Sequence, residues 1–114
     1  MAAEKQFENK VKKFLEANNC WFVKYFANRN TKSGIPDLLA CVNGYFVAIE
    51  VKAETGKPSP LQLHHQEKIR QSGGISIILY PDQFDEFVRL IDALKHGNNG
   101  TAQLIQTYFD KGKI

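Results

Sequence analysis

Residues 34–52, GIPDLLACVNGYFVAIEVK, contain two apolar runs that meet at Asn43-Gly44. Asn-Gly between apolar runs is the strongest short signal for a two-residue turn between antiparallel strands. The sequence therefore predicts a β-hairpin over residues 37–52, with one apolar run in each strand.

Side chains alternate between the two faces of a strand. In the second predicted strand, alternate apolar side chains from Val47 to Val51 share the core face, whereas Glu50 and Lys52 lie on the opposite face. A glutamate and a lysine there are unexpected if a helix covers that face. Because a hairpin brings the ends of its strands together, Asp37 can lie close to Glu50.

These three polar residues have the chemistry of a divalent-metal site. Two carboxylates from neighbouring strands supply the hard oxygen ligands that Mg²⁺ or Mn²⁺ prefers, and an ammonium group can hold a water molecule and offset phosphate charge. The pattern Asp37-x12-Glu50-x-Lys52 therefore predicts metal-assisted phosphodiester hydrolysis. Taken alone, Asp37 could be a turn residue, and Glu50 with Lys52 could be a solvated ion pair.

Upstream of the hairpin, the pattern predicts a helix, a strand and a loop. Apolar residues from Phe7 to Leu15 recur at helical spacing and predict a helix over residues 4–18. The aromatic and β-branched run at 20–27 predicts a strand, and residues 28–36 form a predicted loop.

Downstream of the hairpin, Ser59-Pro60-Leu61-Gln62 has the pattern of a helix start. Ser59 is the expected N-cap, Pro60 takes the first helical position, and Gln62 can complete a capping box. We expect this helix to reach about Ser72 and to end at the two glycines that follow.

The remaining segments complete a small α/β or α+β fold of order α-β-β-β-α-β-α. The run at 75–80 predicts a strand buried on both faces. Asp82 is the expected cap of a further helix that places Phe84 and Phe87 in the core. The tail at 101–109 fits either a strand or a helix.

Composition leaves the function open. The 114 residues suit one domain, expected to span residues 1–114. The apolar fraction of 43% and the charged fraction of 24% are typical of a globular protein and exclude a mainly disordered chain. No apolar run has the length of a membrane span. The net charge of +3 is compatible with nucleic acid without requiring it.

The cysteines and the N-terminus predict a cytoplasmic protein. Cys20 and Cys41 lie in apolar runs without metal-site spacing, so we expect buried free thiols in a reducing compartment. The N-terminal residues lack the apolar region of a signal peptide. Trp21, in the aromatic run at 20–27, is expected in the core.

The motifs together resemble a nuclease family. Pro36-Asp37 followed by Glu50-x-Lys52 resembles the PD-(D/E)xK nuclease core. The following TGKPSPLQ and the two glycines one helix later are similar to the VRR-NUC branch, the virus-type replication-repair nucleases. In that branch a Ser-x-x-Gln follows the Glu-x-Lys strand and opens the next helix. The resemblance covers about residues 7–80.

This resemblance implies a restriction-endonuclease-like α/β core of order α-β-β-β-α-β with a C-terminal helix, in which a mixed central sheet is flanked by helices. It implies DNA cleavage that depends on Mg²⁺ or Mn²⁺. Asp37, Glu50 and the carbonyl of Val51 would ligate the metal, and Lys52 would position the attacking water.

Two further site residues have open roles. Glu8 matches a first-helix glutamate that often joins the metal site in the superfamily, but an i,i+4 pair with Lys12 also explains it. Gln62 would order the site or the scissile phosphate, although the capping box with Ser59 also accounts for it. Gln66, one turn later, is a weaker candidate.

DNA contacts are expected from basic residues in or beside the loops that flank the hairpin. These residues are Lys24, Arg29, Lys32 and Lys57. Stand-alone family members of this size tend to be homodimers related to Holliday junction resolvases. The exposed end of the strand at 75–80, the last helix and the tail are candidate interfaces.

The sequence therefore predicts a metal-dependent DNA endonuclease that is selective for branched or junction DNA. The resemblance suggests a role in viral or phage replication and repair, in the cytoplasm of the host cell. Two alternatives stay open: a non-catalytic DNA-binding accessory module on the same fold, and an RNA-directed nuclease.

Overall fold

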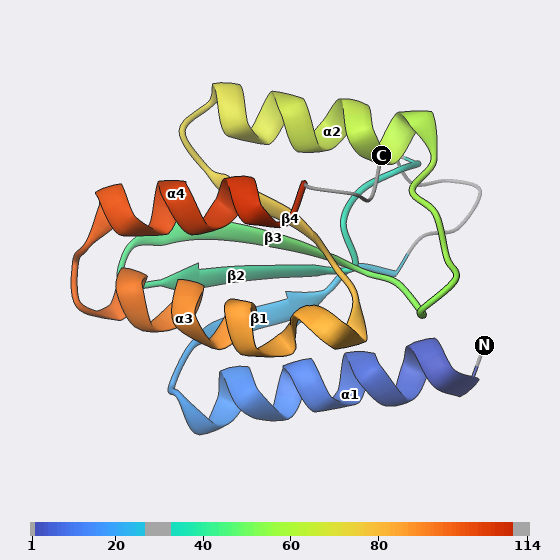
Figure 1. The fold of residues 1–114 in the computed structure, drawn as a ribbon, viewed down its shortest axis with the longest axis horizontal. Helices are drawn as coiled ribbons and strands as arrows, with labels where there is room; N and C mark the ends of the chain where they lie inside the picture. The colour runs from blue at the N-terminus through green and yellow to red at the C-terminus, as the bar shows by residue number, and fades with distance from the viewer. Residues whose placement is uncertain (1, 27–32, 111–114) are drawn as a thin grey trace.

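The computed structural model describes residues 2–26 and 33–110, which form a four-stranded mixed sheet with helices on both faces (Figure 1). The elements are α1 (Ala2–Ala17), β1 (Trp21–Lys24), β2 (Leu38–Val42), β3 (Tyr45–Val51), α2 (Pro60–Gln71), β4 (Ile75–Leu79), the 3₁₀ turn η1 (Pro81–Gln83), α3 (Phe84–Lys95) and α4 (Asn99–Tyr108). The predicted fold class is confirmed.

The predicted hairpin is confirmed and sets the register of the sheet. The strand order is β1-β2-β3-β4; β2 is antiparallel to both of its neighbours, and β4 is parallel to β3. Asn43 and Gly44 have φ angles of 50° and 85°, the positive values that a type I′ turn requires. Leu38 pairs with Ile49 at the end of the β2–β3 ladder, so Glu50 and Val51 extend past it.

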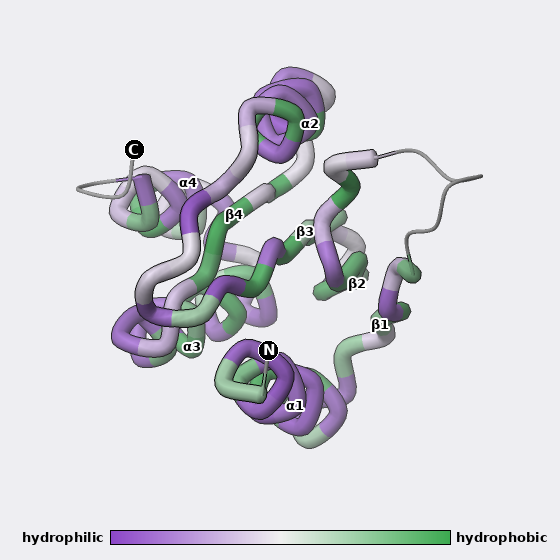
Figure 2. Tube along the Cα trace, turned by 90° about the vertical axis from the view of Figure 1, so that its right-hand side faces the viewer, coloured by the Kyte–Doolittle hydropathy of each residue, from purple (hydrophilic) through white to green (hydrophobic). Residues whose placement is uncertain are grey.

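The main core lies between the sheet and the pair α1 and α3 (Figure 2). The opposite face is covered by α2, which packs on β3 and β4, while α4 packs on α3 and β4. All residues of β4 are buried, as the sequence predicts for a strand covered on both faces.

Two predictions of burial are wrong, for Trp21 and Cys41. Trp21 is 67% exposed and Cys41 is also exposed, whereas Cys20 is buried as predicted. Trp21 pairs with Cys41, and Cys41 with Phe46, across the sheet. These three side chains form a row across β1, β2 and β3, on the same face of the sheet as α2. Helix α2 packs on β3 and β4, whereas the row extends away from it onto the edge strand β1.

The bounds of several elements also differ from prediction, and one open choice is settled. β1 ends at Lys24 instead of 27. Asp82 does not cap α3: it lies in the turn η1 that begins at Pro81, and Gln83 holds the N-cap position. The ambiguous tail is the helix α4, capped by Asn98. The predicted helix and capping box at Ser59 are confirmed, and most of the predicted loop at 28–36 lies outside the described residues.

In the part of the chain that the structure describes, no helix is long and apolar enough to cross a membrane.

Candidate active site

The ends of β2 and β3 bring Asp37 and Glu50 together, as the sequence predicts. Asp37 immediately precedes β2, and its Oδ2 accepts a hydrogen bond of 3.0 Å from the Val51 backbone N–H. Glu50 lies one residue earlier in β3, and its side chain points to the α2 face, with 5% of its surface exposed. The negative charge of Asp37 acts directly on the Glu50 carboxyl.

The backbone of Val51 offers a further oxygen at the same place. The N–H and the C=O of one strand residue point to the same side of the strand. Since the N–H of Val51 is bonded to Asp37, its carbonyl also faces the side of Asp37, beyond the last β2–β3 pair. Three oxygen donors, from Asp37, Glu50 and Val51, therefore gather at one sheet end.

Lys52 and Gln62 hold the Glu50 carboxyl from the α2 side. The Lys52 Nζ lies 3.4 Å from Glu50 Oε2, and Gln62 Nε2 donates to the same oxygen at 2.9 Å. Gln62 also completes the capping box: its Oε1 accepts from the Ser59 N–H at 2.9 Å, and its own N–H donates to Ser59 Oγ at 3.1 Å. The Gln62 side chain thus makes both the capping contacts with Ser59 and a contact to the predicted site residue Glu50.

The second oxygen of Glu50 is the feature that fits a cation. Among the described residues Glu50 Oε1 is buried and has no hydrogen-bond partner, a costly state for a carboxyl oxygen. Burial, together with the charge of Asp37, raises the pKa of the Glu50 carboxyl from 4.5 to about 8, although Lys52 opposes the shift. A divalent cation beside this oxygen would compensate both the burial and the carboxylate repulsion.

The donor set is small. No group of three His, Cys, Asp or Glu side chains suited to a metal ion occurs within residues 2–26 and 33–110. The set consists instead of two carboxylates and a backbone carbonyl, with water to complete the shell. Mg²⁺ is usually bound by one or two carboxylates and keeps several waters, so these residues fit such an ion.

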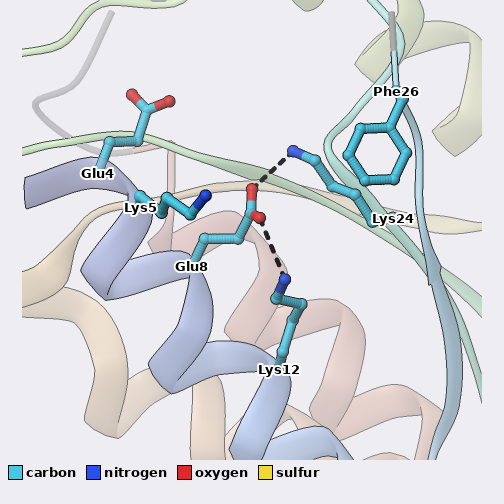
Figure 3. A pocket seen from close by; sticks show the side chains of 6 residues that line it. All are labelled: Glu4, Lys5, Glu8, Lys12, Lys24 and Phe26. Carbon is cyan, nitrogen blue, oxygen red and sulfur yellow. Dashed lines mark hydrogen bonds and ion pairs between the residues drawn. The ribbon is translucent and has the colours of Figure 1, made fainter. Parts of the chain in front are cut away.

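On the α1 face, Lys24 connects Glu8 to the site. Lys24 Nζ lies 2.7 Å from Glu8 Oε1 (Figure 3) and 3.4 Å from Asp37 Oδ1. Glu8 also pairs with Lys12 at 3.5 Å, as its i,i+4 spacing predicts. Burial alone would lower the pKa of Lys24, but the hydrogen bond to Glu8 and the charge of Asp37 outweigh burial and raise it. Lys24 therefore stays charged between the two carboxylates.

Two glycines without a predicted role support the site. Gly34 has a φ angle of 77°, and a Cβ there would lie 2.7 Å from Leu61 Cγ, so the segment that carries Asp37 packs directly on the first turn of α2. Gly56 packs on the stem of Lys52, and its carbonyl accepts from the Tyr80 hydroxyl at 2.8 Å. Gly34 lies within the GIPD motif, which was the available signal; Gly56 had none.

The other predicted residues are placed less closely. Gln66 is buried on α2, and its Oε1 has no hydrogen-bond partner among the described residues. Lys57 is exposed in the segment between β3 and α2. Arg29 and Lys32 lie outside the described residues. The structure thus brings together one cluster of predicted site residues: Asp37, Glu50, Val51, Lys52 and Gln62. Glu8 is linked to this cluster by Lys24, which contacts both Glu8 and Asp37.

Comparison with known families agrees with this arrangement. The family described as archaeal Holliday junction resolvase (Hjc) matches residues 2–101, a segment that contains every predicted site residue. A search of curated proteins found no match to this chain. The resolvases are a family of the PD-(D/E)xK nuclease superfamily, so the predicted superfamily is confirmed. The match covers most of the chain, and the chain therefore belongs to the archaeal Holliday junction resolvase family.

Proposed function

We propose that this protein is a divalent-metal-dependent endonuclease that cuts four-way DNA junctions. The observation that carries the proposal is the buried, unpartnered Oε1 of Glu50, which lies beside Asp37 in a chain of a resolvase family. A carboxyl group in that position costs stability unless the site binds a cation. The neighbouring Lys52 supplies the positive charge that phosphodiester cleavage needs.

Asp37, Glu50 and the Val51 carbonyl would hold the metal, for which Mg²⁺ and Mn²⁺ are the candidates. When bound, a divalent cation polarises a phosphate oxygen and lowers the pKa of a coordinated water. Lys52 would position the attacking water and stabilise the charge that develops on the phosphate. Gln62 orients the Glu50 carboxyl from the helix N-terminus.

The α1 side has a separate function in this proposal. Lys24 lies between Glu8 and Asp37 and, together with Lys12 beside Glu8, offsets the negative charge of Glu8 that would otherwise repel the DNA backbone. Arg29, Lys32 and Lys57 stay predicted phosphate contacts, because loops beside a metal site are where such contacts are needed. Glu8 acts on the site through Lys24 and would add a carboxylate if Lys24 moved to a phosphate.

The finer predictions of identity rest on sequence alone. The VRR-NUC resemblance rests on TGKPSPLQ, which contains Ser59-x-x-Gln62, and on the two glycines one helix later. A role in viral or phage replication and repair, a cytoplasmic location in the host cell and a single domain over residues 1–114 belong to the same proposal. The non-catalytic module is less well supported, because Asp37, Glu50 and Lys52 are all present and adjacent. The RNA-directed nuclease would use the same residues, and only the match to a family of DNA junction resolvases speaks against it.

A homodimer is also part of the proposal, and the row Trp21, Cys41 and Phe46 is its candidate interface. This row leaves two large apolar side chains exposed on one face. The β4 edge suggested by the sequence is less suitable, because Gln106 accepts from the Ser76 N–H and Arg70 donates to the Ser76 carbonyl. Light scattering at micromolar concentration should give twice the monomer mass of 12.9 kDa; a monomer would contradict the dimer.

Substrate selectivity tests the proposed function. Labelled four-way junction, flap, duplex and single-stranded DNA, with an RNA junction for comparison, are incubated with Mg²⁺, Mn²⁺ or EDTA. We expect metal-dependent cutting of the DNA junction in preference to the duplex. Glu50→Ala should abolish it, whereas Glu54→Ala, which removes an exposed carboxylate from the adjacent segment, should not. Salt-sensitive binding without cutting by any metal would support the accessory module.

A further inference from the structure

A hollow between α1 and the end of β1 opens next to the active site (Figure 3). Its volume is about 280 Å³, and it is lined by Glu4, Lys5, Glu8, Lys12, Lys24 and Phe26. Lys24 is shared between the two places, since its ammonium contacts Glu8 in the hollow and Asp37 in the active site. A group bound in the hollow would therefore lie next to the groups that face the scissile phosphate.

Phe26 forms the outer wall of this hollow. It is 75% exposed, and the Lys24 ammonium lies 5.8 Å from the centre of its ring. A single exposed aromatic residue is ordinary on a protein surface. An aromatic ring beside several ammonium groups is instead the combination that binds single-stranded nucleic acid, where bases stack on the ring and cations follow the backbone.

The charged side chains of the hollow differ in whether they already have an ion-pair partner. Glu8 is paired with both Lys24 and Lys12. In the described part of the chain, no carboxylate lies within ion-pair distance of the Lys5 ammonium, and Figure 3 shows the Lys5 side chain extending from α1 on the side of Glu8. Lys5 is therefore the ammonium most available to an incoming phosphate.

We propose that this hollow binds one unpaired nucleotide adjacent to the scissile phosphate, with its base stacked on Phe26 and its phosphate held by Lys5 and Lys12. This inference rests on the proposed function and names the part of the substrate that the hollow selects. The volume lies just below the range of roughly 300–1,000 Å³ that drug-sized ligands occupy, so it suits a nucleotide better than a base pair. Where junction strands exchange, unstacking a base costs less than inside a duplex.

A cycle of changes in protein and DNA tests the stacking. Affinity for a four-way junction is measured in EDTA for the wild type, Phe26→Ala and Phe26→Trp. An abasic residue is placed in turn at each of the few nucleotides on either side of the mapped cleavage site. We expect Phe26→Ala to weaken binding about tenfold and Phe26→Trp to preserve it. At one position the abasic residue should weaken wild-type binding similarly without weakening Phe26→Ala further.

The stacking would be overturned if the affinity losses from Phe26→Ala and from the abasic residue add at every position. An unchanged affinity of Phe26→Ala would overturn it as well. Leu104→Ala is the matched control, because Leu104 is 74% exposed and lies on α4, away from the hollow. Thermal unfolding of each variant checks that folding survives, which the exposure of Phe26 favours.

The phosphate contact has its own test. Lys5→Ala should reduce the slope of log affinity against log salt by about one, whereas Lys13→Ala, an exposed lysine of α1 that does not line the hollow, should leave it unchanged. Equal slopes for wild type and Lys5→Ala would remove Lys5 from the site. The proposed function fails separately, if the wild type neither binds nor cuts junctions; if it cuts them and Phe26→Ala binds like the wild type, only the nucleotide site fails.

Discussion

Replacing Glu50 with glutamine should make the protein more stable at alkaline pH in the absence of divalent metal. The pKa of Glu50 is raised from 4.5 to about 8 in the folded chain, mainly by burial and by the charge of Asp37. Between these two values the folded state holds a proton that the unfolded state has lost. The stabilisation from Glu50 is therefore complete below about pH 4.5 and is lost as the pH rises through about 8. Glutamine stays neutral at all of these pH values and can still accept the hydrogen bond from Gln62.

The expected effect is large on the scale of protein stability. Each pH unit inside this window lowers the free energy of unfolding by about 1.4 kcal/mol. Over the whole window from 4.5 to about 8, the fall approaches about 5 kcal/mol, which compares with a total of about 5–15 kcal/mol for a typical domain. By pH 8 to 9, wild type should therefore be several kcal/mol less stable relative to its value at pH 5, and Glu50→Gln should lack most of this fall.

Urea unfolding in EDTA at half-unit steps from pH 5 to 9 measures the effect. Glu54→Gln, which removes an exposed carboxylate, is the control and should follow wild type. Added Mg²⁺ should restore the stability of wild type at pH 8 by mass action and should help Glu50→Gln much less. Parallel pH profiles for wild type and Glu50→Gln would refute the reasoning that burial and Asp37 keep Glu50 protonated.

Four further substitutions test other parts of the account. Lys52→Ala should slow junction cleavage by about 10²–10³-fold in single-turnover assays, because it removes the cation beside the reacting phosphate; a rate near wild type would exclude that role. Gly34→Ala should lower the free energy of unfolding in urea by about 1–3 kcal/mol, because φ is 77° and its Cβ would meet Leu61; an unchanged midpoint would show that the segment relaxes freely. Ser59→Ala should lower the free energy of unfolding by about 1 kcal/mol through loss of the N-cap. Gln62→Ala should in addition slow cleavage, because it removes the hydrogen bond to Glu50; equal cleavage rates of the two variants would limit Gln62 to capping.

The local patterns were sufficient for the parts of the fold that local geometry determines. Asn43-Gly44 sets the hairpin, and its period-2 alternation places Glu50 and Lys52 on one face near Asp37. The capping box predicts the start of α2 to the residue, because Ser59 and Gln62 satisfy each other's backbone groups within one turn. Neither feature depends on the rest of the chain.

The errors concern properties that depend on tertiary packing. Trp21 and Cys41 lie in apolar segments, but their burial depends on how much of the sheet α2 covers, and the sequence does not give that coverage. Asp82 resembles an N-cap, yet Pro81 begins a 3₁₀ turn that shifts the cap of α3 to Gln83. The DNA contact of Lys24 stays a prediction, but its bridge between Glu8 and Asp37 could not be foreseen, because it requires α1 and β1 to be adjacent.

The most direct test of the central claim is the rate of four-way junction cleavage in Mg²⁺ by wild type, Asp37→Asn and Glu54→Gln under single-turnover conditions. Asp37→Asn keeps an acceptor for the Val51 N–H but loses the carboxylate charge. We expect it to cut at least about a thousandfold more slowly, while it binds the junction in EDTA within a few-fold of wild type and Glu54→Gln cuts normally. Cleavage by Asp37→Asn at the wild-type rate would contradict a metal site built on Asp37 and Glu50.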